Sequence, residues 1–126
     1  MRILIAINDA STLSSLSYVL LCNGMEVTAC KEFDQAVDAL TGTWYDLLIT
    51  DIGMPDASID KTLKLLGFIK RHFCSEVIVT ADRWKENEDG ICRLHGLNYV
   101  IKPFEIREVL TICARIAPLM PACSSC

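Results

Sequence analysis

Short apolar runs alternate along the chain with longer segments whose apolar residues recur every three or four positions. The apolar runs predict five strands at Met1–Ile7, Met25–Ala29, Tyr45–Thr50, Glu76–Thr80 and Tyr99–Ile101, and the continuous first run suits a strand buried on both faces. The longer segments predict helices from near Ser11 to Asn23, over Phe33–Gly42, from Asp60 through Ile69, over the polar stretch Trp84–Leu94, and over Glu105–Ala117.

Turn and capping residues mark the ends of these elements. Asn8–Ser11 supplies a turn and a helix cap after the first strand, and Asn23-Gly24 ends the helix that follows. Gly96 ends the fourth helix, and Pro118 follows the fifth. Asp60 is expected to cap the third helix, whose predicted apolar face consists of Leu63, Leu66, Phe68 and Ile69.

Strands that alternate with helices of this length are typical of an α/β domain with a parallel sheet and right-handed crossovers. We therefore predict a doubly wound (βα)5 fold, a five-stranded sheet with helices on both faces. The length of 126 residues fits one domain, which we assign to residues 1–117. Residues 118–126 are expected to form a C-terminal tail or the start of a linker.

Charge and hydropathy exclude several classes of function. The net charge is −4 and no cluster of Lys and Arg stands out, so direct binding to nucleic acid by this chain alone is not expected. Each apolar run is far shorter than the roughly 20 residues of a membrane-spanning helix, and the first is too short for a signal-peptide core. We therefore expect a cytoplasmic protein that does not insert into a membrane.

Cysteines are frequent, and five of the seven lie in apolar stretches, namely Cys22, Cys30, Cys74, Cys92 and Cys113. We interpret these five as reduced core residues, because a chain this apolar does not need a disulfide scaffold and an odd count leaves one thiol unpaired. Cys123-Ser-Ser-Cys126 has the spacing of a redox or zinc half-site, but no second pair or histidine cluster accompanies it.

Polar residues follow the predicted strands at the place where a doubly wound sheet binds its ligands, outside the carboxyl ends of the strands. They are Asn8 and Asp9 after the first strand, Asp51 after the third, Thr80 after the fourth and Lys102 after the fifth. Each residue alone could be a helix cap, a loop residue or a solvated charge. Their convergence on one sheet edge indicates a functional site.

The chemistry of these side chains indicates phosphoryl transfer. Two neighbouring carboxylates, Asp9 and Asp51, repel each other unless a cation lies between them, and oxygen ligands of this kind suit Mg²⁺. Beside a metal and the Lys102 ammonium, Asp51 is an anionic nucleophile that could accept a phosphoryl group as an acyl phosphate. Lys102 and the metal would neutralise the phosphoryl oxygens, and the Thr80 hydroxyl and a backbone amide would donate hydrogen bonds to them.

The spacing of these residues resembles the receiver domain of two-component response regulators. Asp9 lies 42 residues before Asp51. Asp51 lies 29 residues before Thr80, which lies 22 residues before Lys102, and the three intervals are similar to those of the family. The resemblance covers residues 2–117. It implies a flavodoxin-like receiver architecture and a single-domain signalling switch whose output is another protein.

Two motifs support the resemblance and contain its functional residues. Asp51-Ile-Gly-Met-Pro55 resembles the phosphoacceptor loop, and Tyr99-Val-Ile-Lys-Pro-Phe104 resembles the family's terminal signature. The resemblance implies that a histidine kinase or a phosphotransfer protein phosphorylates Asp51 in the presence of Mg²⁺. Asp9, Asp51 and the backbone carbonyl of Gly53 would ligate the metal.

The resemblance also implies how the phosphoryl group is bound and read. Lys102, the Thr80 hydroxyl and the backbone amide of Ala81 would contact its oxygens. Thr80 would move toward the group and Tyr99 would swing inward, which reshapes the surface of the fourth helix, fifth strand and fifth helix. That surface is expected to bind a downstream target protein, and it could also form a homodimer. Catalysis is limited to the domain's own phosphorylation and dephosphorylation, so an enzyme acting on a separate substrate is not expected.

The chain departs from the family pattern at two places. Most members have two acidic residues after the first strand, whereas here Asn8 stands in place of the first. Asn8 could still contact a metal-bound water, so we expect weakened Mg²⁺ binding. The loop at Asp56–Asp60 lacks the family's usual glycine, which changes the connection into the third helix. Trp84 is a candidate partner contact, and the Lys102–Pro103 peptide is similar to one that is usually cis in the family.

Other functions fit parts of the sequence. The hydroxyl-rich segment Ser11–Ser15 could bind a phosphate at a helix start, as in a flavin-binding electron carrier, but it lacks a glycine and leaves Asp51 and Lys102 without a role. A receiver-fold protein-interaction domain that works without phosphorylation would account for Asn8 and the altered loop. A phosphatase is set aside, because Gly53 stands where its second aspartate would be needed.

Overall fold

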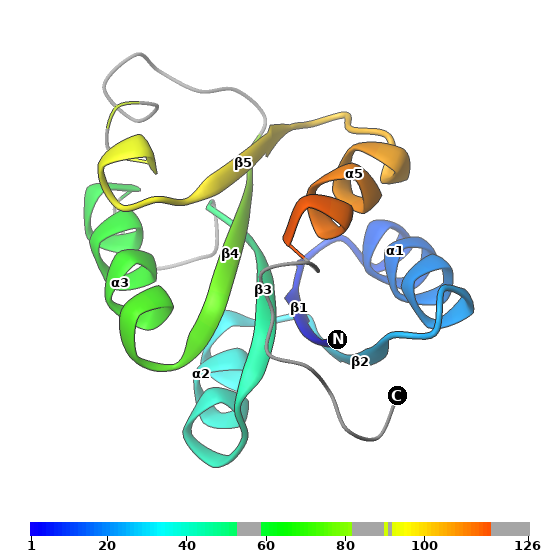
Figure 1. Ribbon diagram of the computed structural model, residues 1–126, viewed down its shortest axis with the longest axis horizontal. Coiled ribbons are helices and arrows are strands. Elements are labelled where there is room, and N and C mark those ends of the chain that lie inside the picture. The colour runs from blue at the N-terminus through cyan, green and yellow to red at the C-terminus, as the bar shows by residue number, and fades with distance from the viewer. Residues whose placement is uncertain (53–58, 82–89, 91, 117–126) are drawn as a thin grey trace.

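One parallel sheet organises the chain. In this computed structural model, residues 1–52, 59–81, 90 and 92–116 are described, with side chains from residue 62 onward in the second range. The strand order is β2-β1-β3-β4-β5, and all four neighbouring pairs are parallel (Figure 1). The strands are β1 (Arg2–Ala6), β2 (Glu26–Cys30), β3 (Tyr45–Asp51), β4 (Cys74–Ala81) and β5 (Asn98–Ile101). The predicted parallel sheet is therefore confirmed, with strand ends within two residues of those expected.

Helices cover both faces of the sheet, as the predicted fold class requires (Figure 1). On one face lie α1 (Ala10–Cys22) and α5 (Ile106–Ile116). On the other lie α2 (Phe33–Gly42) and α3 (Ile59–His72). The predicted fourth helix lies mostly outside the described residues, of which 90 and 92–94 are helical.

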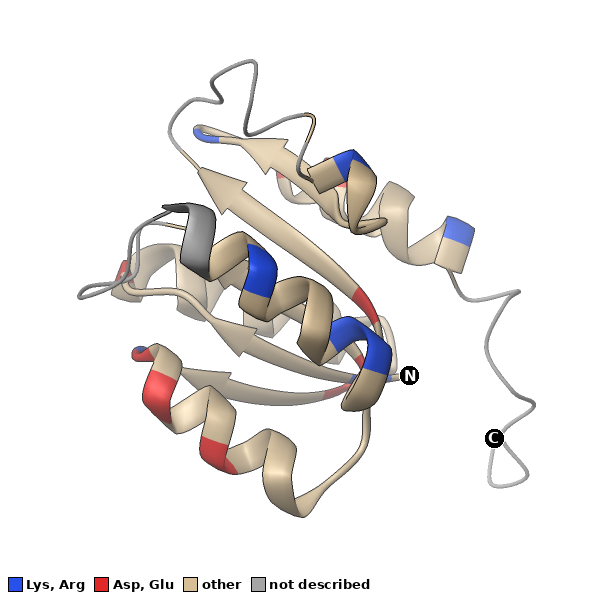
Figure 2. Cartoon of the chain, turned by 90° about the vertical axis from the view of Figure 1, so that its left-hand side faces the viewer, with Lys and Arg blue, Asp and Glu red and all other residues tan. Residues whose placement is uncertain are grey.

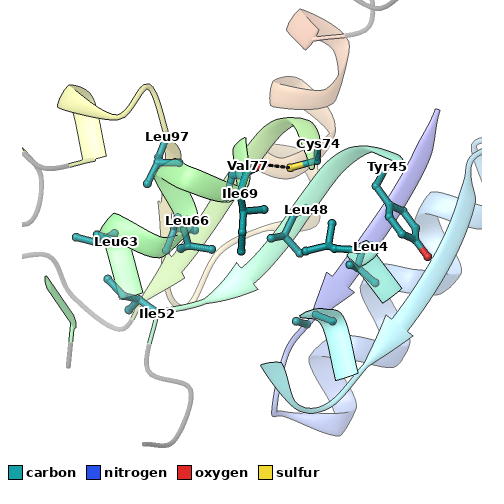
Figure 3. Packing of buried hydrophobic residues seen from close by; sticks show 14 of the residues in the cluster. Leu4, Tyr45, Leu48, Ile52, Leu63, Leu66, Ile69, Cys74, Val77 and Leu97 are labelled. Atoms are coloured by element: carbon teal, nitrogen blue, oxygen red, sulfur yellow. Dashed lines mark hydrogen bonds between the residues drawn. The ribbon is translucent and has the colours of Figure 1, made fainter. Parts of the chain in front are cut away.

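The alternation of side chains along β1 divides the core into two layers. Ile3, Ile5 and Ile7 pack with α1 and α5, whereas Leu4 and Ala6 pack with α2 and α3. Figure 3 shows the second layer, in which residues of α3 meet residues of β3 and β4. Because both faces of the central strands are buried, their sequences are continuous apolar runs rather than alternating patterns.

The ends of α1 follow the predicted capping chemistry closely. Asp9 is the N-cap residue, and its side chain accepts a hydrogen bond from the backbone N–H of Thr12 at 2.9 Å. The helix therefore begins one residue before Ser11. Asn23 is the C-cap residue, and Gly24 follows it with φ of 80°, a backbone conformation that glycine adopts without strain.

Two expectations about buried residues are wrong. Phe68 was expected on the apolar face of α3, but it is 45% exposed, because its position on the helix lies opposite the buried Leu63 and Leu66. The Phe68 ring instead lies 4.5 Å from the ring of His72. Cys22 was expected in the core, but it is exposed at the last position of α1.

The burial of the other described cysteines agrees better with the prediction of reduced core residues. Cys74, Cys92 and Cys113 are buried with free thiols, and Cys30 is half-buried. Burial raises the pKa of the Cys74 thiol to about 12, so this group is protonated at neutral pH. Cys123 and Cys126 lie outside the described residues. Within the ranges given above, no helix is both long and apolar enough to span a membrane.

Candidate functional site

The predicted site residues lie at the carboxyl ends of neighbouring strands. Asp51 is the last residue of β3, and it pairs in register with Thr80 of β4. Ala6 pairs with Thr50, which places the segment after β1 beside Asp51. Lys102 directly follows β5, and its backbone N–H donates to the Ala81 carbonyl at 2.7 Å. The sheet order therefore brings together residues that are far apart in the sequence.

The Asp51 carboxylate is the centre of this group, and it is buried. Its Oδ1 atom lies 2.8 Å from the Lys102 ammonium nitrogen. The Thr80 hydroxyl donates to the same oxygen. Its Oδ2 atom accepts a hydrogen bond from the backbone N–H of Asn8 at 3.1 Å. Three donors from three different segments therefore contact one carboxylate.

This arrangement solves the problem of placing a charge inside the protein. A buried carboxylate is strongly unfavourable unless it is paired and hydrogen-bonded. Lys102 supplies the opposite charge, and its side chain remains 29% exposed, which keeps part of the ammonium hydrated. Thr80 is fully buried, so its hydroxyl has exchanged solvent for Asp51. The site thus holds a buried anion whose partners come from outside its own strand.

Asp9 lies at the surface of the same edge and is held by its own helix. Its Oδ2 atom accepts hydrogen bonds from the backbone N–H and the hydroxyl of Thr12. These bonds are the main reason that the pKa of the Asp9 carboxyl is lowered; desolvation opposes them in part, and the nearby charge of Lys102 adds a lesser lowering effect. Asp9 is therefore ionised at neutral pH, and it lies within the electrostatic influence of Lys102.

The oxygen donors of this edge fit a Mg²⁺ ion that keeps several of its waters. Two carboxylates lie at this edge, Asp51 at the end of β3 and Asp9 in the turn after β1, and oxygen is the ligand that Mg²⁺ prefers. Gly53, expected to contribute its carbonyl, lies outside the described residues. Among the residues that are described, no group of three or more His, Cys, Asp or Glu side chains could hold a metal. A metal here would depend on few protein ligands.

A cleft opens beside Lys102. It has a volume of about 490 Å³ and lies between the start of α1 and the segment after β5. Lys102 belongs both to this cleft and to the contact with Asp51. The residues that line the cleft are Ser11, Thr12, Ser15, Lys102, Pro103, Phe104 and Ile106.

Other predicted residues are placed as follows. The Lys102–Pro103 peptide bond is cis, as the resemblance implied. Tyr99 is half-buried and packs against the core layer on the α2 and α3 side of the sheet. Asn8 is exposed, and Trp84 lies outside the described residues.

Two contacts of the site were not predicted from the sequence. The bond to Asp51 from Asn8 comes from its backbone, whereas the sequence suggested a role for its side chain. Nothing in a side-chain pattern signals a backbone donor. Thr12 was considered only as part of a phosphate-binding segment, although an aspartate followed three residues later by threonine is a recognisable capping pair. That spacing could have identified Thr12 as the residue that holds Asp9.

Comparison with known sequences identifies the family to which this chain belongs. The profile of the response regulator receiver domain matches residues 3–114. The phosphate regulon transcriptional regulatory protein PhoB of Klebsiella pneumoniae is 28% identical over 130 residues, which cover 94% of this chain and 54% of PhoB. The response regulator protein FleR of Pseudomonas aeruginosa is 28% identical over 118 residues, which cover 92% of this chain and 24% of FleR. The chain therefore spans about half the length of PhoB and a quarter of FleR.

Solved structures share the fold. A two-component response regulator from Clostridium difficile superposes with a TM-score of 0.83 at 18% identity, over 97% of this chain and 99% of that one. At this identity the likeness concerns the fold alone. Together with the profile match over most of the sequence, it shows that the chain belongs to the response regulator receiver domains of two-component signalling systems.

Proposed function

We propose that this receiver domain is a phosphorylation-controlled switch that accepts a phosphoryl group on Asp51. The donor would be a histidine kinase or a phosphotransfer protein in the cytoplasm. One observation carries the proposal: Asp51 is a buried carboxylate at the ligand-binding edge of the sheet, and both Lys102 and Thr80 contact its Oδ1 atom. A lysine and a hydroxyl beside this oxygen would place a cation and a hydrogen-bond donor next to the incoming phosphoryl group, and groups positioned in this way stabilise phosphoryl transfer.

The proposed reaction is an in-line transfer between two side chains. A carboxylate oxygen of Asp51 attacks the phosphorus of a phosphohistidine, and an oxygen–phosphorus bond forms while the phosphorus–nitrogen bond breaks. The histidine nitrogen retains the bonding electron pair and takes up a proton. The donor side chain would approach through the cleft that Lys102 lines, because Lys102 also contacts this carboxylate. Bound Mg²⁺ would supply positive charge that offsets the charge of the phosphoryl oxygens.

The residues of this chain would divide the remaining work. Asp9, Asp51 and the Gly53 carbonyl would hold the metal, and the Asn8 side chain could contact one of its waters. The Lys102 ammonium already faces Asp51 at 2.8 Å, so a small movement takes it to the new phosphoryl oxygens. Thr80 and the backbone N–H of Ala81 would donate hydrogen bonds to the same oxygens.

The output would follow from the redirection of Thr80. Its hydroxyl now contacts the Asp51 carboxylate, and phosphorylation places a larger anion at that position. Tyr99, half-buried on β5, would move inward and alter the surface of the fourth helix, β5 and α5. That surface would then bind a downstream target protein, in keeping with a two-state element biased by a local charge change.

Intact mass after incubation with a small-molecule phosphodonor and Mg²⁺ tests the central step. We expect the wild type to gain the mass of one phosphoryl group, which hydroxylamine removes. Asp51→Asn should gain none. Asp46→Asn is a matched control, because Asp46 lies on the same strand near its other end, where it accepts from the Arg2 backbone. Failure of the wild type with small donors and with a panel of histidine kinases would contradict the proposal.

A receiver-fold interaction domain that works without phosphorylation is the second candidate. It is favoured by the Asp51 carboxylate itself, both of whose oxygens already accept hydrogen bonds from the protein. The replacement of one acidic residue by Asn8 points the same way. The two functions separate when target binding is measured for the wild type and Asp51→Asn, because only the switch requires the modified carboxylate. The receiver-family match over residues 3–114 does not support the flavin-binding alternative.

A further inference from the structure

Two neighbouring helices on one face of the molecule carry opposite charges. Figure 2 shows acidic positions along α2 and basic positions along α3 on the same side of the sheet. The α2 sequence contains Asp34 and Asp38 but no Lys or Arg. Among the described side chains of α3, which start at residue 62, the charged groups are Lys64, Lys70 and Arg71 with His72 beside them. We call this surface the α2–α3 face.

Most of these charges are not used within the molecule. Lys70 lies 3.9 Å from Glu76 and is half-buried. Asp34, Asp38, Lys64 and Arg71 are exposed, and none of the ion pairs within the described part of the chain includes them. An acidic helix and a basic helix therefore lie side by side with their outward charges unpaired.

Exposed apolar side chains lie on the same face. Leu65 is 42% exposed and Phe68, one turn further along α3, is 45% exposed. The Phe68 ring contacts the rings of His72 and Phe73 at centroid distances of 4.5 and 6.0 Å. Clustered aromatic groups beside charges are typical of a protein interface rather than of isolated surface residues.

We propose that the α2–α3 face binds a second copy of this chain. A two-fold axis that runs parallel to the helices places α2 of one copy against α3 of the other, and it does so twice. Each acidic helix then meets a basic helix, and Leu65 and Phe68 are covered between them. An axis perpendicular to the helices would instead oppose acidic to acidic and basic to basic, which is unfavourable. The charge pattern thus selects both the partner and the symmetry.

This interface is distinct from the surface of the fourth helix, β5 and α5 discussed above. Its charged and apolar side chains belong to α2 and α3, whereas α5 covers the opposite face of the sheet and β5 is the edge strand beyond β4. The Asp51 carboxylate does not contribute to it. The proposal therefore stands or fails independently of phosphoryl transfer at Asp51.

Sedimentation equilibrium of the full chain tests the proposal. We expect a concentration-dependent monomer–dimer equilibrium at about 50 mM salt, weakened at least several-fold at about 500 mM salt because screening acts on exposed charges. A chain that remains monomeric at the highest soluble concentration in low salt overturns the proposal. So does a dimer whose dissociation constant does not depend on salt.

Charge reversal identifies the surface. Asp34→Lys with Asp38→Lys makes both helices basic, and Lys64→Glu with Arg71→Glu makes both acidic, so each double variant should weaken its own dimer by about tenfold or more. An equimolar mixture of the two double variants should form a heterodimer, because each basic helix again meets an acidic one. Two monomeric variants that remain monomeric when mixed overturn the proposal.

Two further variants control for effects of charge reversal on folding and for dimerisation through a different surface. Phe68→Ser changes no charge and exposes no new apolar group, and it should also weaken the dimer. Arg107→Glu is the matched control on α5, where Arg107 is exposed and contacts Glu105. It should leave the dimer unchanged. A dimer that Arg107→Glu abolishes and the α2 and α3 variants preserve would move the interface to α5 and overturn the proposal.

Discussion

Two aspartates lie at the carboxyl ends of neighbouring strands, Asp9 in the turn after β1 and Asp51 as the last residue of β3, and their surroundings differ in opposite ways. Asp9 is exposed after β1 and accepts its hydrogen bonds from Thr12, three residues later. Asp51 is buried at the end of β3 and accepts from Lys102, Thr80 and Asn8, which are 51, 29 and 43 residues away. Local sequence therefore determines the environment of Asp9, and sheet topology determines that of Asp51.

This contrast separates two properties of the site. The buried carboxylate depends on long-range partners for its stability, because an unpaired charge in the interior is costly. The exposed carboxylate of Asp9 remains hydrated, so its charge costs little free energy and it remains available to a cation. We expect substitutions around Asp51 to alter folding stability and substitutions around Asp9 to alter ion binding and acid sensitivity.

The largest expected effect follows removal of the cation beside Asp51. Lys102→Met leaves a buried carboxylate without its opposite charge, so the free energy of unfolding at neutral pH should fall by about 2 kcal/mol. Urea denaturation measures this change. In an Asp51→Asn background, where no charge needs a partner, the same substitution should cost much less. Equal losses in both backgrounds would show that Lys102 stabilises the fold by packing and not by pairing with Asp51.

An acidic residue in place of Asn8 should strengthen ion binding at the β1 end of the site and lower stability in the absence of metal. Asn8→Asp adds a third carboxylate to this edge, so Mg²⁺ affinity should rise by about tenfold. Without metal, the variant should be less stable than the wild type, because the new charge repels Asp9 and Asp51. Calorimetric Mg²⁺ titration and thermal unfolding with and without Mg²⁺ measure both effects. Unchanged Mg²⁺ affinity would refute the idea that Asn8 weakens metal binding.

The hydroxyl donor to Asp51 should contribute less than the lysine. Thr80→Val keeps the shape of the side chain but removes the donor, and we expect a loss of about 1 kcal/mol in the free energy of unfolding. Thr50→Val is the matched control, because Thr50 is also fully buried but donates only a long 3.3 Å bond to the Asp51 carbonyl. It should cost clearly less. A control as damaging as Thr80→Val would indicate a general penalty at buried threonines.

Much of this molecule is predictable from its sequence, for physical reasons that can be named. Strands such as β3 are buried on both faces, so they appear as unbroken apolar runs and their carboxyl ends are identifiable. Because parallel strands all end at one edge, the positions of Asp51 and Thr80 near the ends of β3 and β4, and of Lys102 directly after β5, are sufficient to bring them together.

The remaining features depend on tertiary structure that a sequence pattern does not contain. Phe68 is as apolar as its neighbours, and only the packing of α3 on the sheet decides that it lies outside the core. The Asn8 backbone donor carries no side-chain signal at all. The burial of Asp51 and the exposure of Asp9 also differ, although both are aspartates that follow apolar strands.

The smallest expected effect concerns the local contacts of Asp9. Hydrogen bonds from Thr12 lower the pKa of the Asp9 carboxyl in the folded protein, so they stabilise the fold above the ordinary aspartate pKa and are lost as the pH falls through the lowered value. Thr12→Val removes the hydroxyl bond and should raise this pKa toward its ordinary value, which NMR titration of the side-chain carboxyl carbon would detect. The stability difference from the wild type should be present at neutral pH and shrink in acid.

Thr111→Val, which removes a helical hydroxyl that donates to a backbone carbonyl at 2.9 Å, should show no such dependence on pH. A stability difference for Thr12→Val that does not depend on pH would mean that Asp9 caps the helix without any contribution from its negative charge. The charge of Asp9 would then not contribute to the stability of the site, in contrast to the charge of Asp51.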